Sequence, residues 1–318
     1  MKKAAVYFLA ILIILDAFVS VLLYKPFSPW QKLAPMPITR TEMASALSGG
    51  EIYLIGGYLS PNSLSVMQKY SPVLDTWLNL KDLPLALDHT AAVSAGDYIY
   101  EIGGLYLAEK GSPSKEVFRY SIKENKWETM ADLPKPLGAV SAVLIGKTIH
   151  VFGGIGGLGS SVASHYVYDI DSKAWSEEPP MPAPNDHMAV ATDGVKVFLA
   201  GGREKFPDSV LSRLFIYDSK TKLWQEGPNL PMPRGDMYGA IAGKYFIVAG
   251  GENDKGKVFD AVEALNIETM QWTILPSLRS VRHGASAVSL NGYFYLVGGR
   301  DANQYWGYIG LNERLEIK

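Results

Sequence analysis

The stretch IHVFGG, residues 149 to 154, carries the pattern that decides this fold: an apolar strand that ends in a pair of glycines. The pattern occurs six times, with glycine pairs at 56/57, 103/104, 153/154, 201/202, 250/251 and 298/299. A tryptophan stands 26 residues before the first glycine of each pair, at Trp30, Trp77, Trp127, Trp175, Trp224 and Trp272. A constant spacing of this kind indicates a repeat architecture.

Each repeat contains signals for four short strands. Two apolar strands, joined by a tight-turn signal such as Asn291-Gly292, lead to the glycine pair. A loop of variable length then precedes a third strand, and the next tryptophan opens a fourth. Four antiparallel strands in roughly 48 residues are typical of one propeller blade. We therefore predict an all-β fold, a six-bladed β-propeller with blades at about 38–80, 86–130, 136–178, 185–227, 233–275 and 281–317.

The succession of paired glycines, a tyrosine and a tryptophan resembles the kelch repeat, and the resemblance extends over residues 29–317. It implies a kelch β-propeller. The sixth unit ends at Lys318 before any fourth strand, whereas Trp30 opens a fourth strand that has no partners before it. We expect residues 29–33 to complete blade six and close the ring, because closure removes exposed sheet edges.

The N-terminal segment is strongly apolar. Residues 4–24 read AAVYFLAILIILDAFVSVLLY, follow Lys2 and Lys3, and contain one charge, Asp16. This length suits a membrane-spanning helix. We predict a signal-anchor within residues 1–25 and a propeller at 26–318 on the extracytoplasmic side, since the lysines favour an N-terminus inside. The alternatives are a cleaved signal peptide, which gives a secreted or periplasmic protein, and a buried soluble helix.

Composition excludes several classes of function. The formal net charge of -2 and the pI near 6.2 provide no basic surface for nucleic acid. The absence of cysteine excludes disulfides and thiolate chemistry. GIGGLG, residues 154–159, matches a dinucleotide fingerprint, but it follows a second strand of a blade rather than opening a helix. No nucleotide and no other cofactor is expected.

Two sets of polar residues share one face of the predicted propeller, which we call the rim. They lie in the loop before each first strand and in the loop after each glycine pair. The candidate ligand-binding residues are Arg40, Glu42, Asp88, His89, Asp186, His187, Arg203, Arg234, Arg282 and Arg300. Arginine forks suit carboxylates and phosphates, which favours a small anionic or carbohydrate ligand or an acidic peptide. The competing interpretation is that these charges bridge neighbouring blades and pair with one another.

Glu252, Asp236 and His283 are candidate catalytic residues, because arginines can hold an anion while a nearby carboxyl or imidazole moves a proton. The histidines at positions 89, 187 and 283 lie in alternate blades, but the third is one residue out of register with the others. Since successive side chains of a strand point to opposite faces, no metal site is predicted.

The sequence favours a non-enzymatic binding module, membrane-anchored or exported, that presents its charged rim to an unknown protein partner or a small ligand. The alternative is an enzyme. The chain is similar to bacterial kelch propellers that interconvert sialic acid anomers with arginine and glutamate around the channel, which implies a sugar-acid mutarotase or epimerase. The fold alone does not separate the two, because the loops of a propeller determine its function.

Overall fold

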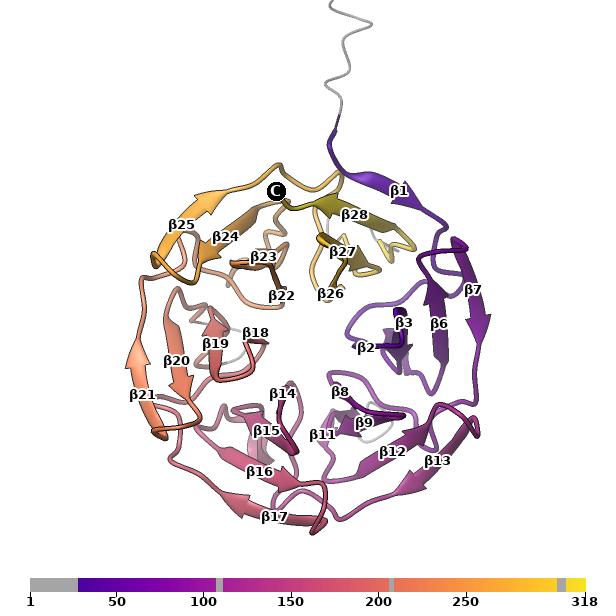
Figure 1. Ribbon diagram of the computed structural model, residues 1–318, viewed down its shortest axis with the longest axis vertical. Coiled ribbons are helices and arrows are strands. Elements are labelled where there is room, and N and C mark those ends of the chain that lie inside the picture. The colour runs from indigo at the N-terminus through magenta and orange to yellow at the C-terminus, as the bar shows by residue number, and fades with distance from the viewer. Residues whose placement is uncertain (1–27, 107–110, 206–208, 302–306) are drawn as a thin grey trace, which may run out of the picture.

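Six four-stranded antiparallel sheets surround one axis in the computed structural model, which describes residues 28–106, 111–205, 209–301 and 307–318 (Figure 1). The predicted six-bladed all-β propeller is therefore confirmed. The predicted apolar helix at 4–24 lies outside the described residues. Among the residues that are described, no helix has both the length and the hydrophobicity needed to cross a bilayer.

Each blade runs from an innermost strand at the axis to an outermost strand at the periphery. Blade one contains β2 (Ala44–Ser48), β3 (Glu51–Ile55), β6 (Met67–Ser71) and β7 (Thr76–Asn79). Blade two contains β8 (Ala91–Ala95), β9 (Tyr98–Ile102), β12 (Val117–Ser121) and β13 (Lys126–Thr129). Blade three contains β14 (Ser141–Ile145), β15 (Thr148–Phe152), β16 (His165–Asp169) and β17 (Ala174–Glu177).

The remaining blades repeat this order. Blade four contains β18 (Ala189–Thr192), β19 (Lys196–Ala200), β20 (Leu214–Asp218) and β21 (Leu223–Glu226). Blade five contains β22 (Tyr238–Ala242), β23 (Tyr245–Ala249), β24 (Val262–Asn266) and β25 (Gln271–Ile274). Blade six contains β26 (Ser286–Leu290), β27 (Tyr293–Val297), β28 (Asn312–Glu316) and β1 (Gln31–Leu33). The rim loops add the ribbons β4 (Tyr58–Leu59) with β5 (Asn62–Ser63) and β10 (Leu105–Tyr106) with β11 (Ser112–Pro113), and the 3₁₀ turn η2 (Gly157–Gly159).

Blade six is closed by the two ends of the chain, as the repeat count predicts. Strand β1 pairs antiparallel with β28, and Gln31 lies opposite Arg314 (Figure 1). Trp30, immediately before β1, is 1% exposed. Its ring meets Phe294 of the same blade edge-on, at 6.2 Å between ring centroids. The N-terminal strand is thus a packed part of the last sheet.

The six repeat tryptophans tie successive blades together. Each indole Nε1 donates to a backbone carbonyl in the connecting segment of the preceding blade. Trp77 reaches Ala34, and Trp175 reaches Ala131, both at 2.9 Å. Trp30 continues the series across the chain ends by donating to Pro276 at 2.9 Å. The constant spacing between tryptophan and glycine pair therefore reflects one geometry used six times.

The glycine pairs allow each blade to lie against the loop of its neighbour. At Gly201, φ is +62°, a conformation that side chains rarely adopt, and an added Cβ would lie 2.6 Å from the carbonyl oxygen of Arg234 in the loop of blade five. The core then fills the space between adjacent sheets: Ile52 and Leu54 of blade one pack with Val297 of blade six.

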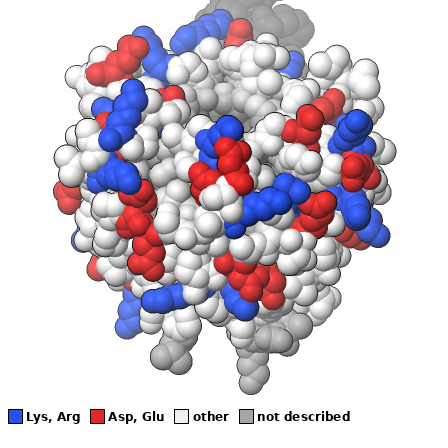
Figure 2. Space-filling model, turned by 60° about the horizontal axis from the view of Figure 1, so that its bottom comes forward, with Lys and Arg blue, Asp and Glu red and all other residues white. Residues whose placement is uncertain are grey.

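The axis of the propeller is a channel that widens away from the rim. Beneath the rim lies a cavity of about 140 Å³, lined by the innermost strands and including Ser45, Ser141 and Tyr238. Further along, the same strands border an open space of about 530 Å³. Over the outer surface seen in Figure 2, basic and acidic side chains are interspersed, and no large region carries a single sign.

Candidate functional site

The two sets of rim loops contact each other in every blade. Isolated backbone bridges join Thr41 with Tyr58, Asp186 with Arg203, and His283 with Arg300, and equivalent bridges occur in the other three blades. These bridges place both sets on the same face, where the repeat positions them.

A closed ring of backbone hydrogen bonds surrounds the axis at this face. One residue from each blade donates its N–H to the carbonyl of the equivalent residue in the preceding blade, at distances from 2.8 to 3.4 Å. These residues all have φ between 50° and 60° and are Glu42, His89, Ala139, His187, Asp236 and Gly284. Each ring residue stands two positions before an innermost strand, and four of the six have ionisable side chains, which the repeat therefore brings to the axis.

These four side chains join with Arg203, Glu252 and His283 in a network that we call the axial cluster. Glu42 lies between two imidazoles: its carboxylate oxygens are 3.6 Å from His89 Nε2 and 3.6 Å from His283 Nδ1. Asp236 Oδ1 is 3.2 Å from His187 Nε2.

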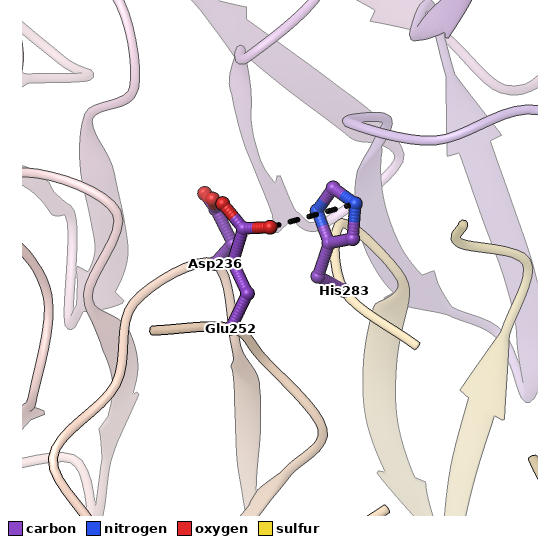
Figure 3. Close-up of side chains that lie close together, drawn as sticks. All are labelled: Asp236, Glu252 and His283. Atoms are coloured by element: carbon purple, nitrogen blue, oxygen red, sulfur yellow. Dashed lines mark ion pairs between the residues drawn. The ribbon is translucent and has the colours of Figure 1, made fainter. Parts of the chain in front are cut away.

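Arg203 connects the acidic groups of blade five. Its guanidinium is 2.7 Å from Glu252 Oε1 and 3.6 Å from Asp236 Oδ2. Figure 3 shows Asp236, Glu252 and His283 facing one another across blades five and six. A partly open pocket of about 50 Å³ lies beside the ring, which is room for a few water molecules.

Carboxylates adjacent in sequence orient two of the histidines. Asp88 Oδ1 lies 2.5 Å from His89 Nδ1, and Asp186 makes the same contact with His187. Burial by itself lowers the pKa of His89, but the charge of Glu42 and the contact with Asp88 outweigh it and raise that pKa to about 10. The pKa values of His187 and His283 are also raised, against the effect of burial, by neighbouring carboxylates.

The carboxyl groups of the cluster are perturbed in opposite directions. Although burial opposes it, the pKa of Glu42 is lowered by the surrounding imidazoles. The pKa of Glu252 is raised by burial and by the charge of Asp236. Imidazolium groups therefore provide positive charge at the axis, and the cluster is held by mutual pairing.

Three of the predicted ligand-binding arginines lie inside the blades. The side chains of Arg40, Arg234 and Arg282 are all 0% exposed. Each donates to the carbonyl of the first glycine of its own blade, 16 residues later. Each also meets a buried partner on the third strand, and the three pairs are Arg40 with Gln68, Arg234 with Glu263 and Arg282 with Glu313. Burial lowers the pKa of Arg40 to about 10 and that of Arg282 to about 9.

The remaining candidates occupy the outer part of the rim. The carboxylates of Asp88 and Asp186 accept hydrogen bonds from Ser63 and Ser161 of neighbouring loops. Arg300 lies over the ring of Tyr308, at 5.5 Å from its centroid. The axial cluster therefore contains Glu42, His89, His187 and Arg203 of the predicted binding set and all three catalytic candidates.

Two polar residues, the partly buried Tyr238 and the buried Glu101, are absent from the sequence prediction. The hydroxyl of Tyr238 donates to Glu42 at 3.3 Å. Glu101 is 0% exposed, and burial raises its pKa well above the usual value. Glu101 occupies the strand position at which the other blades have Leu or Val. This replacement of an apolar residue by glutamate is the sequence signal that would have identified it.

Sequence comparison assigns the fold to a family. The KLHDC2/KLHL20/DRC7 Kelch-repeats domain matches residues 88–301, and a Kelch motif matches residues 39–84. The chain belongs to the kelch-repeat family. The resemblance recognised in the glycine and tryptophan pattern is thereby confirmed.

Several relatives contain this kelch domain within longer chains. Kelch-like protein 35 of Mus musculus is 28% identical over 183 residues, which cover 58% of this chain and 30% of the relative. Alpha-scruin of Limulus polyphemus is 27% identical over 303 residues, or 90% of this chain and 28% of the relative. This kelch chain thus spans less than half the length of these curated relatives.

A solved structure titled "Structure of YjhT" has the same fold. It aligns with a TM-score of 0.80 at 16% identity and covers 90% of this chain and 97% of the other. At this level of identity, the likeness concerns the propeller fold alone.

Proposed function

We propose that this kelch propeller is a non-enzymatic interaction module that binds a protein partner through its rim loops. The observation that carries the proposal is the pairing within the axial cluster. Glu42, Asp236 and Glu252 each contact a cationic group of the protein, and the cavity beside them is about 50 Å³. A catalytic acid or base must come within hydrogen-bond reach of a bound substrate, whereas these carboxylates already face cationic groups of the protein.

Binding is better supported at the loops that follow the glycine pairs. Between the first glycine of a pair and the next tryptophan, the spacing varies from 21 to 24 residues, whereas the spacing from each tryptophan to the next glycine pair is constant. Loops on a rigid scaffold are where binding residues concentrate. In the kelch relatives, the propeller is one part of a longer chain. This arrangement is consistent with a propeller that serves as the binding domain.

We also propose that the rim faces away from a membrane. The apolar segment at 4–24 supports an anchor or an export signal. Strand β1 leads into residues 34–43, which reach the rim at Glu42. The chain therefore enters blade six from the opposite face, and an anchor would leave the rim free for a partner.

The test uses the full chain with a photocrosslinking residue at one position at a time. Asn62 and Lys255 are exposed in rim loops, whereas Asp193 and Lys244 are exposed in hairpin turns of the opposite face. We expect crosslinks to one discrete protein from the first pair of positions and none from the second. Equal crosslinking from both faces would contradict the proposal.

The sugar-acid isomerase is the second candidate, and the raised pKa of Glu252 beside Arg203 is the observation in its favour. Exchange NMR on N-acetylneuraminate with the full chain separates the two functions. A non-enzymatic module leaves the rate of anomer interconversion at the uncatalysed value. Acceleration that is lost in E252Q would establish the enzyme instead.

A further inference from the structure

Three side chains from two adjacent blades converge at the edge of the axial cluster. Asp236 comes from the loop before β22, Glu252 follows the glycine pair of blade five, and His283 lies in the loop before β26. One donor atom of each lies within 4.8 Å of the others (Figure 3). Their side chains are 6%, 16% and 11% exposed, so the group is largely enclosed but not sealed.

Each of the three side chains is oriented from outside by a different neighbour. Arg203 is 2.7 Å from Oε1 of Glu252, which leaves Oε2 toward His283. His187 Nε2 approaches Asp236, and Glu42 faces Nδ1 of His283. Glu42 is 3.6 Å from Nδ1 of His283, so a carboxylate lies on that side of the ring and Nε2 is on the side of Glu252, the arrangement found at metal-binding histidines.

Within this group of three side chains, the carboxylate of Glu252 and the imidazole of His283 are not close enough to form a hydrogen bond. Glu252 Oε2 and His283 Nε2 are 3.9 Å apart, which is too long for a hydrogen bond. Oδ1 of Asp236 is buried and lies 3.2 Å from Nε2 of His187, on the side away from Nε2 of His283. The carboxylates of Asp236 and Glu252 lie within 4.8 Å of each other, so their negative charges repel.

We propose that Asp236, Glu252 and His283 form a binding site for a divalent transition-metal cation such as Zn²⁺, with Nε2 of His283 as the nitrogen ligand. Imidazole nitrogen and carboxylate oxygen are ordinary ligands of zinc, and three protein ligands leave a fourth position for water or a partner group. Tetrahedral ligands at about 2.0–2.1 Å from zinc lie about 3.3 Å apart. The 3.9 Å gap between Glu252 and His283 is close to this separation.

Charge balance supports the same assignment. The carboxylates of Asp236 and Glu252 match the two positive charges of the cation. His89 and His187 have carboxylate partners of their own in Glu42, Asp88 and Asp186. A cation also relieves the repulsion between the two ligating acids. This site goes beyond the proposed protein binding, because it concerns the axial cluster rather than the outer loops.

The test is a titration of chelator-treated full-chain protein with Zn²⁺, followed by calorimetry. We expect one ion per chain in the wild type and affinities lower by about 100-fold or more in E252Q and H283Q. Loss of a residue that only contacts a metal ligand costs about 10–100-fold in metal affinity. This is the loss expected for E42Q, and removal of a ligand itself should cost more. D171N alters an exposed carboxylate and H165Q alters a distant imidazole, and both controls should bind as the wild type does.

Affinities in E252Q and H283Q equal to that of the wild type, or the absence of wild-type binding, would overturn the proposal. If H283Q fails to fold, the wild type bound to Co²⁺ decides. A single paramagnetically shifted imidazole N–H resonance, from Nδ1 of the ligating ring, supports the site. The absence of any shifted resonance refutes it.

Discussion

The closure of blade six by Trp30 can be tested with a single substitution, Trp30→Ala. The indole is 1% exposed, packs against Phe294 and donates to Pro276 from the neighbouring connection. Truncating a buried tryptophan to alanine costs about 3–5 kcal/mol of unfolding free energy. For a chain of 318 residues, each kcal/mol lowers Tm by about 1.5 °C, which gives a decrease of about 5–8 °C.

The assay is guanidinium unfolding of the full chain followed by far-UV circular dichroism, which does not depend on the removed fluorophore. Two variants calibrate the result. Trp30→Phe keeps an aromatic ring but removes the N–H, and we expect a loss of about 1 kcal/mol from the hydrogen bond. Trp175→Ala removes a repeat tryptophan that is only half-buried and makes the same type of hydrogen bond to Ala131. It should therefore be less destabilising than Trp30→Ala.

The reasoning fails if Trp30→Ala unfolds within about 1 kcal/mol of the wild type, the usual size of a mutation outside a core. It also fails if Trp175→Ala costs as much as Trp30→Ala. Either result would mean that β1 lies on blade six without contributing to its stability.

Two further predictions concern groups inside the blades. Arg234→Met leaves Glu263 buried without its cation and should cost about 3–5 kcal/mol of unfolding free energy. Urea unfolding should show that R234M/E263Q is more stable than R234M, because the double variant no longer buries an unpaired charge. Equal stabilities of the two variants would contradict a stabilising ion pair. Burial lowers the pKa of His150 to about 4 and that of His165 to about 3. Because the unfolded chain then binds more protons than the folded one, stability should fall as the pH drops from about 6.5 toward 4. Denaturant midpoints across this range should decrease less in H150Q/H165Q than in the wild type, and parallel decreases would show that the pair does not titrate as assigned.

Most of the fold was predictable because the propeller repeats one local pattern. The glycine pair, the tight turn and the tryptophan each fix a local conformation or contact, so six copies define six blades. The missing fourth strand of the last unit also predicted β1, now seen paired with β28. Residues 1–27 lie outside the described part of the chain, and the predicted anchor remains a prediction.

The direction of the rim side chains was harder to predict. Arg40 and Glu42 are two residues apart, yet the arginine enters the blade while the carboxylate faces the axis, because Glu42 has φ of 54°. A signal for the buried arginines did exist in the third strands. Blades one, five and six, which contain the buried arginines, have Gln68, Glu263 and Glu313 on the third strand. The other three blades have Phe118, Tyr166 and Phe215 at the equivalent position. The variable loop between the partners, which changes their separation in sequence, hides this correlation.

The histidines illustrate a second limit of the sequence pattern. His283 is one residue out of register with His89, which argued against a common site. In the structure both rings contact Glu42, since the long side chain of that residue spans the difference. Register predicts which backbone positions are equivalent, but it does not determine how far each side chain reaches.

The ring of backbone hydrogen bonds at the axis has a consequence of its own. A helix leaves unpaired donors at one end and unpaired acceptors at the other, and these ends give it a macrodipole. The six peptide groups from Glu42 to Gly284 follow one another around a circle, so this chain of bonds has neither end. Its dipoles cancel in the plane of the circle. The backbone thus holds the acidic and basic groups of the axis in place without the unpaired donors or acceptors that a helix end would present to them.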